Sequence, residues 1–257
     1  MIGQVLAWFA DPANWTGATG VPTRTLEHLL IAFAAVIVAA LVGLPIGLYI
    51  GHTGRLASIA INTANIGRAV PSFALMVAIL PISLALAPVF GYAPEVGLRL
   101  IPIFLAMLLL AVPPILVASY AGLRAVDRDL IEAGRGMGMT GRQILRRIEL
   151  PLSMAVIVGG FRTATLQVIA TATIGAVLAY GGLGRFIVDG LARSEPERLF
   201  AGAILVALLA LGVDAILAVV QRMLTPRALR VEAEHGRAMT EAVDPLLEAP
   251  RATDARV

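Results

Sequence analysis

The sequence predicts an all-α integral membrane protein with about five membrane-spanning helices. Hydrophobic residues make up 58% of its 257 residues, whereas charged residues make up only 14%. The mean hydropathy is +0.86, and a water-soluble globule of this size cannot keep so much apolar surface away from water. The apolar stretches are also unbroken, which disfavours a transmembrane β-barrel, because apolar and polar residues alternate along each of its strands.

The composition also excludes several classes of function. A soluble cytosolic enzyme, a disordered chain and a secreted disulfide scaffold do not fit so apolar a sequence. Cysteine is absent, so disulfide and thiol chemistry are excluded as well. The basic residues are all arginine and are not clustered in one stripe, so no nucleic-acid partner is expected.

Five apolar stretches are long enough to cross a bilayer, because about 20 apolar residues span its hydrocarbon core. The first and third stretches contain no charged residue, and each of the others contains a single charged residue. The stretches are residues 29–51, 56–94, 100–123, 150–184 and 199–221.

The second stretch is too long for one span. We expect it to hold one spanning helix over residues 56–79, followed by a non-crossing segment around residues 81–94. Two crossings there, and therefore six spans in all, are the alternative.

The arginines near the span ends predict the orientation. Ten lie on the side that holds residues 124–149 and five lie on the other side. Since positive charge accumulates in cytoplasmic loops, we expect the N-terminus outside and the C-terminus in the cytoplasm. The expected parts are an external N-terminal lead-in over residues 1–24, a transmembrane domain over residues 25–224, and a cytosolic, disordered tail over residues 225–257.

The charged segment 124–149 predicts two short helices joined by a glycine turn. Asp129 is expected to cap the first helix, and the three glycines between residues 134 and 138 are expected to end it. Thr140 and Gln143 have the spacing of a capping box that starts the second helix. Short helices held at the face of a membrane are suited to receive a push from a soluble motor.

This segment resembles the coupling loop of binding-protein-dependent ABC importer permeases. That family's pattern is Glu-Ala-Ala, three residues, Gly, nine residues, Ile, one residue, and Leu-Pro. One position in seven departs from this pattern, because Gly134 stands where the family has its second alanine. At the motif glycine, Gly138, a side chain is expected to obstruct the turn. The matching ATPase-coupling positions are Glu132, Ala133, Gly134, Gly138, Ile148, Leu150 and Pro151.

Five further segments resemble one branch of that family, the permeases for quaternary amines such as glycine betaine. They are residues 68–75, 130–139, 160–165, 170–176 and 181–184.

The resemblance implies a type I ABC importer permease in the inner membrane of a bacterium, with an osmoprotectant such as glycine betaine, choline or carnitine as its cargo. It also implies that the chain is a transport subunit and not an enzyme, with ATP and Mg bound by a partner ATPase and no cofactor of its own. Without any lysine, the chain cannot form a P-loop. The further partners implied are an extracytoplasmic substrate-binding protein, a second permease subunit that is a copy or a related chain, and the lipid bilayer.

Other functions remain open at this point. A permease of the same family could import another small solute, such as an amino acid. A secondary transporter driven by ions would show inverted repeats and coupling-ion ligands, and an intramembrane enzyme would show paired catalytic groups; neither pattern is evident.

Polar and ionisable residues inside spans are candidates for the translocation path or for a layer of intramembrane charge. Asp214 is expected to pair with Arg162 or Arg68, as a structural ion pair or beside the cargo path. Prolines at positions 71, 113 and 114 are expected to break the hydrogen-bond ladders of spans two and three, which a membrane helix tolerates where the break lines a cavity or neighbours satisfy the backbone. No metal ligands and no catalytic residues are identified. The candidates are Arg68, Pro71, Ser72, Arg162, Thr163, Thr171, Thr173 and Asp214.

Overall fold

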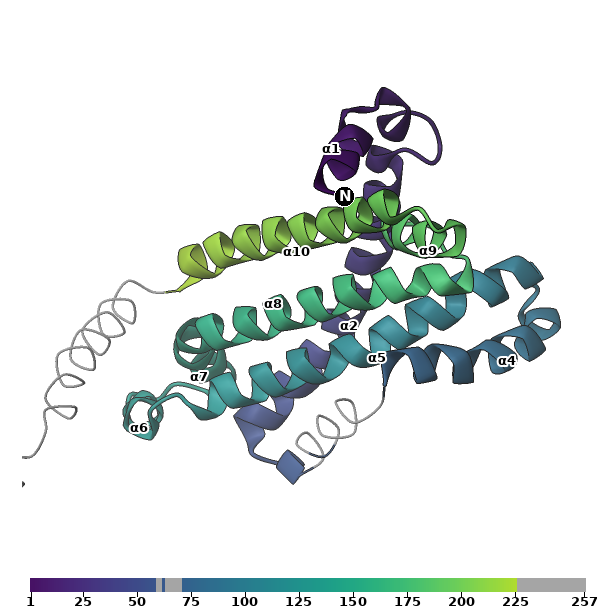
Figure 1. Cartoon of the computed structure of the whole chain (residues 1–257). Coiled ribbons are helices and arrows are strands. Elements are labelled where there is room, and N and C mark those ends of the chain that lie inside the picture. The colour runs from purple at the N-terminus through teal and green to yellow at the C-terminus, as the bar shows by residue number, and fades with distance from the viewer. Residues whose placement is uncertain (59–61, 63–70, 226–257) are drawn as a thin grey trace, which may run out of the picture.

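The computed structural model describes residues 1–58, 62 and 71–225, and these residues form helices and no strand (Figure 1). The helices run in the order α1 (Ile2–Ala10), η1 (Pro12–Trp15), α2 (Val21–Thr53), α4 (Ser72–Phe90), α5 (Pro94–Arg124), α6 (Arg128–Gly136), α7 (Gly141–Ile144), η2 (Leu145–Glu149), α8 (Leu150–Gly175), η3 (Ala176–Leu178), α9 (Gly184–Arg193) and α10 (Pro196–Leu224).

Five helices are long and apolar enough to cross a membrane, which confirms the predicted number for the described part of the chain. They are α2, α4, α5, α10 and one continuous helix, Gly141–Leu178, that is made of α7, η2, α8 and η3. The expected tail is outside the described residues, apart from its first residue, 225.

The second span differs from the prediction. It begins at Ser72 and runs to Phe90, so the segment expected not to cross forms its second half. Pro81 and Pro88 lie inside this helix, and Gly91, with φ of 71°, ends it. A membrane helix tolerates proline where neighbouring groups satisfy the freed carbonyl. Most of the expected helix between residues 56 and 71 lies outside the described residues.

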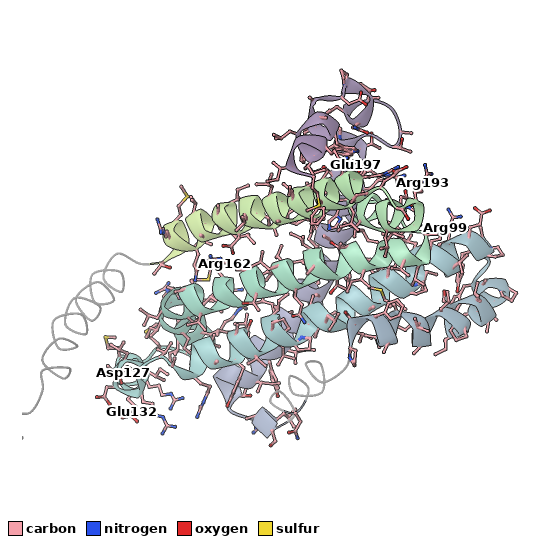
Figure 2. All side chains as sticks on the ribbon, in the orientation of Figure 1. Arg99, Asp127, Glu132, Arg162, Arg193 and Glu197 are labelled. Carbon is pink, nitrogen blue, oxygen red and sulfur yellow. The ribbon has the colours of Figure 1, made fainter. Side chains whose placement is uncertain are left out.

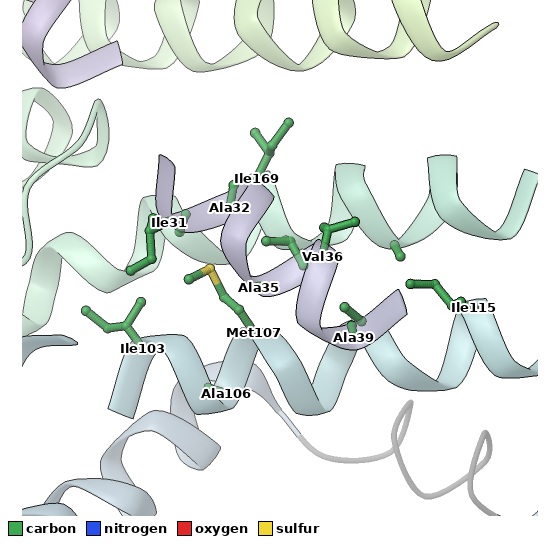
Figure 3. Packing of buried hydrophobic residues seen from close by; sticks show 14 of the residues in the cluster. Ile31, Ala32, Ala35, Val36, Ala39, Ile103, Ala106, Met107, Ile115 and Ile169 are labelled. Carbon is green, nitrogen blue, oxygen red and sulfur yellow. The ribbon is translucent and has the colours of Figure 1, made fainter. Parts of the chain in front are cut away.

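Helix α5 is the centre of the bundle and packs against α2, α4 and α8. Ile103, Ala106 and Met107 of α5 are fully buried among Ala35 of α2 and Ile169 of α8 (Figure 3). In Figure 1, α5, α8 and α10 run side by side and α2 crosses behind them. In the most apolar 18 residues of α10 only 6% are buried, compared with 50% in those of α5. Most of the α10 surface is therefore left for lipid or another subunit.

Helix α5 tolerates prolines 113 and 114. The helix continues through both residues to Arg124. At this point α8 lies close against α5, because a Cβ built on Gly160 would be 2.8 Å from the Pro114 carbonyl oxygen. This close packing holds the helix together where proline removes a hydrogen-bond donor.

Three glycines at four-residue spacing bring α2 against α5. Gly43, Gly47 and Gly51 are all buried. A Cβ on Gly47 would lie 2.5 Å from the carbonyl oxygen of Leu116 and one on Gly51 would lie 2.8 Å from the Leu123 Cβ. Small residues at this spacing allow close helix packing in membranes, where no hydrophobic effect drives helices together.

The N-terminal helix packs on the end of the bundle away from α6. Trp8 of α1 meets Phe186 of α9 edge to face, with the ring centroids 5.4 Å apart. The indole Nε1 of Trp15 donates to the carbonyl oxygen of Phe9 over 2.8 Å. Helix α1 is therefore held against α9 and α10, and η1 contacts α1 and α2.

Candidate functional site

Helix α6 is a polar helix that follows α5 at one end of the bundle. Its N-terminal capping residue is Asp127, whose carboxylate accepts a 3.0 Å hydrogen bond from the Asp129 amide. The cap is therefore Asp127 and not Asp129, which instead lies in the first turn, where its charge favours the helix dipole. Glu132 and Ala133 are exposed, and Figure 2 shows Asp127 and Glu132 together at this end.

The glycine turn after α6 is a Schellman motif. The Met139 amide donates to the Gly134 carbonyl over 3.1 Å, and the Gly138 amide donates to the Arg135 carbonyl over 2.9 Å. Gly138 has φ of +79°, and a Cβ there would meet nothing within 4 Å. The turn therefore needs glycine for its backbone conformation, and the expected steric obstruction is wrong. Gly134 does not end the helix either, which continues to Gly136.

The departure from the family pattern at Gly134 has a local reason. Gly134 is buried, and a Cβ there would lie 2.9 Å from the Ile148 Cδ1. The contact joins α6 to η2. An alanine would require only the terminal methyl of Ile148 to move.

The second short helix begins as predicted. Thr140 and Gln143 form both hydrogen bonds of a capping box, which satisfies the free amides at this end. Ile144 is buried, whereas Arg142 and Arg146 are exposed, as the amphipathic pattern indicates. The helix then continues through η2 into α8, with Leu150 and Pro151 in the first turn of α8, so a displacement of α7 would be carried directly into that span.

A hydrogen bond to a buried carboxylate links this helix to the end of the first span. The Glu149 carboxylate Oε2 lies 2.5 Å from His52 Nδ1, and Glu149 is only 4% exposed. Sequence reasoning missed the pair because 97 residues separate its members. The available signal was a lone carboxylate between two apolar residues at the entrance of a span, a position that needs a partner.

A polar cavity of about 220 Å³ lies beside this pair, between the ends of α2 and α5 and helix α6. Three guanidinium groups and three further polar side chains line it. They belong to Arg124, Arg128, Arg135, His52, Glu132 and Glu149.

Arg162 and Asp214 form a two-pronged ion pair between α8 and α10. Arg162 Nε lies 2.5 Å from one carboxylate oxygen of Asp214, and one terminal nitrogen lies 2.6 Å from the other. Gln221 extends the network, since its side-chain oxygen accepts from Arg162 over 3.5 Å and its amide donates to the Ala155 carbonyl over 2.7 Å. This is one of the two pairings expected from the sequence. The other expected arginine, Arg68, lies outside the described residues.

The remaining path candidates that the structure describes make no side-chain hydrogen bond to this pair. Pro71 and Ser72 are at the start of α4. The hydroxyl groups of Thr163 and Thr173 donate to carbonyls four residues earlier in α8, over 3.0 and 3.2 Å, and Thr171 is buried. The structure therefore does not gather these candidates into one site, and a role for them in the path stays a prediction.

Within residues 1–58, 62 and 71–225, no three His, Asp or Glu side chains come together as metal ligands would. The features that stand out chemically are the α6–α7 loop and the intramembrane ion pair.

The fold is that of a known class of transporter. The chain superposes on the permease of the MetNI methionine ABC transporter, solved in inward-facing conformations, with a TM-score of 0.66 and 22% identity over 78% of this chain and 94% of that one. It also superposes on an amino acid ABC transporter solved with histidines, with a TM-score of 0.58 and 19% identity over 79% of this chain and 91% of that one. These similarities establish the type I ABC importer permease fold.

Curated relatives are similar over most of the chain. The carnitine transport permease protein OpuCB of Listeria monocytogenes is 36% identical over 83% of this chain and 92% of its own length. The choline transport system permease protein OpuBB of Bacillus subtilis is 35% identical over 80% and 89%. The osmoprotectant import permease protein OsmW of Salmonella typhimurium is 35% identical over 80% and 92%.

Residues 43–230 match the family model described as the binding-protein-dependent transport system inner membrane component. The match contains four of the five candidate spans whole, the last third of the first, and the entire α6–α7 loop. The chain therefore belongs to this family of inner-membrane permease components of ABC importers.

Proposed function

We propose that the chain is the permease subunit of an ATP-driven importer for a small quaternary-amine osmoprotectant, such as glycine betaine, carnitine or choline. The observation that carries the proposal is the similarity, at 35–36% identity, to permeases named for carnitine, choline and osmoprotectant transport. Cargo would pass through a pathway that the chain forms with a second permease subunit, either another copy or a related chain.

The α6–α7 loop is the proposed contact with the ATPase. Its exposed Glu132 and Arg142 offer charges to a soluble partner, and its second helix continues without interruption into the α8 span. ATP and Mg would be bound by that partner, and its closure would move the loop. A motion of α7 would also reach the first span through the contact between Glu149 and His52.

This assignment places the α6–α7 end in the cytoplasm of a bacterium and the α9 end outside. The arginine bias supports the same orientation, with ten arginines on the α6–α7 side and five on the other. A separate extracytoplasmic binding protein would deliver the cargo at the α9 end, where residues 1–15 also pack.

Uptake measurements test the cargo. We expect a bacterial host without its own osmoprotectant uptake to accumulate labelled glycine betaine, carnitine or choline when it expresses the chain with its ATPase and binding protein. The matched control replaces the catalytic glutamate of the ATPase and should abolish uptake. Accumulation of methionine or histidine without any quaternary amine would contradict the proposal and favour the amino-acid alternative.

A further inference from the structure

A large polar cavity lies at the end of the bundle opposite the α6–α7 loop. It has a volume of about 600 Å³ and lies between the first turns of α2 and α5 and the turn that follows η3. Figure 2 shows Arg99 at this end, away from Asp127 and Glu132. The polar side chains that line the cavity are Arg24, Glu27, Glu95, Arg99, Tyr180 and Arg185.

The turn on one side of the cavity is fixed by its contact with α2. The Gly182 amide donates to the Glu27 carboxylate over 2.8 Å, and Gly182 has φ of +81°. A Cβ on Gly181 would collide with that carboxylate. The two glycines thus hold Tyr180 beside the cavity against the first span.

Two of the three guanidinium groups are already neutralised. Arg24 pairs with Glu27 over 2.8 Å and Arg185 pairs with Asp189 over 2.5 Å. Arg99, in contrast, is exposed and has no acidic partner within ion-pair distance among the described residues. With those two pairs neutral, the charges that remain on the wall are Arg99 and Glu95, so Arg99 is the group that can meet an anionic part of a ligand.

An apolar groove continues from the cavity along α2 and α5. It has a volume of about 480 Å³, and Leu100 and Tyr180 line both spaces. Leu30 and Phe104 are among the apolar side chains on its walls. Burial and the nearby Glu27 carboxylate raise the pKa of Tyr180, so its ring stays a neutral phenol, and such a ring attracts a cation to its face.

The two adjoining spaces fit the two ends of one small molecule. Arg99 offers a guanidinium to a carboxylate, in the geometry that favours two-pronged hydrogen bonding. Tyr180 and the groove offer an aromatic face and apolar walls to a methylated ammonium group, which is poorly hydrated. A cargo with a cation and no carboxylate would use the second space alone.

We propose that this cavity is the entry site of the permease and that Arg99 selects zwitterionic quaternary amines, which carry a carboxylate, over purely cationic ones. This inference rests on the proposed function and goes beyond it by naming a site, a ligand chemistry and the residue that discriminates.

The test compares glycine betaine with choline in the complete transporter, at saturating cargo-loaded binding protein, so that the rate reports transfer into and through the permease. Arg99→Gln should lower the betaine rate about tenfold, because a hydrogen bond between charged groups is lost, and should leave the choline rate within about twofold. Arg99→Lys should restore much of the betaine rate. Arg193→Gln is the matched control, since Arg193 lies at the same end but lines a different cavity.

The outcomes separate the two proposals. An unchanged ratio of betaine to choline rates in Arg99→Gln, with normal amounts of the variant in the membrane, would overturn the entry site alone. An equal loss of both rates would also overturn it, because Arg99 would then act on the fold or on docking of the binding protein. Failure of the wild-type transporter to move any quaternary amine would overturn the proposed function and this inference together.

Discussion

At the scale of single residues, the contact between Glu149 and His52 connects the start of the α8 span to the end of α2. The carboxylate is buried at the point where the loop helix becomes the α8 span, and its partner is in the last turn of α2. A buried carboxylate that loses its partner keeps the cost of desolvation without the compensating hydrogen bond.

We therefore expect His52→Ala to destabilise the folded protein by about 1.5–3 kcal/mol, the range for hydrogen bonds to charged groups. Thermal unfolding of the purified protein in detergent measures this. Thr53→Ala is the control, since Thr53 is exposed and its hydroxyl bonds only to nearby backbone groups, the Tyr49 carbonyl and the Arg55 amide. If the pair also transmits motion, we expect a second effect. Glu149→Gln keeps a hydrogen-bonding group, so it should have little effect on folding and a larger effect on the coupling of ATP hydrolysis to transport. Equal coupling ratios in wild type and Glu149→Gln would remove that role.

The intramembrane pair of Arg162 and Asp214 makes a different prediction, because both partners face a region where an unpaired charge is costly. We expect Arg162→Gln and Asp214→Asn each to reduce the amount of folded protein recovered from membranes. The double variant should recover most of it, since two neutral amides can hydrogen-bond to each other. Size-exclusion profiles of the four proteins measure the recovery. Additive losses in the double variant would show that the two residues are not coupled.

The sequence predicted part of this residue-level chemistry. It identified Asp214 as a group that needs an arginine, because an ionisable residue inside a span demands a partner, but helix rotation about the axis decides which arginine. It did not identify the Glu149–His52 pair, since neither residue stands deep inside an apolar stretch and their proximity depends on the packing of α2 against α5 and α8.

At the scale of elements, short-range patterns were the reliable ones. The capping box of Thr140 and Gln143 is formed, because its hydrogen bonds depend only on residues three apart. The second span was misplaced because the stretch 56–94 is longer than one crossing and its composition does not say which part crosses; the helix runs from Ser72 through Pro81 to Phe90. The close contact of α2 with α5 was also missed, although the spacing of Gly43, Gly47 and Gly51 is a sequence signal for it.

The turn between α6 and α7 allows backbone conformation and side-chain size to be tested separately. Gly138 has a left-handed conformation with free space around it, so Gly138→Val should cost about 1–2 kcal/mol of local strain and reduce uptake. Gly138→Asn should retain most uptake, since asparagine tolerates this conformation. Uptake is compared at equal amounts of membrane-inserted protein. Equal activity of the two variants would mean that the loop does not depend on this turn.

At the scale of the whole molecule, the two ends of the bundle differ in character. One end carries the polar α6–α7 loop and the small cavity beside Glu149. The other carries the larger cavity, the N-terminal helix and α9 (Figures 1 and 2). Composition and span count predicted the class of protein because they depend on totals. The position of each cavity could not be predicted, because it depends on how helices far apart in sequence meet.

Orientation in the membrane decides whether these two ends can have the proposed roles, and the absence of native cysteine gives a clean background for measuring it. Single cysteines at Thr53 and Arg142, both exposed at the loop end, should react only with reagents that enter the cytoplasm. Cysteines at Ala18 and Arg193, exposed at the other end, should react with impermeant maleimides added to intact cells. Gly190 is unsuitable as an outer site, because a Cβ there would lie 2.6 Å from the Leu199 amide nitrogen. Labelling of Arg142→Cys from outside would place the loop beyond the reach of any cytoplasmic ATPase and would put the Arg99 cavity on the side from which imported cargo leaves.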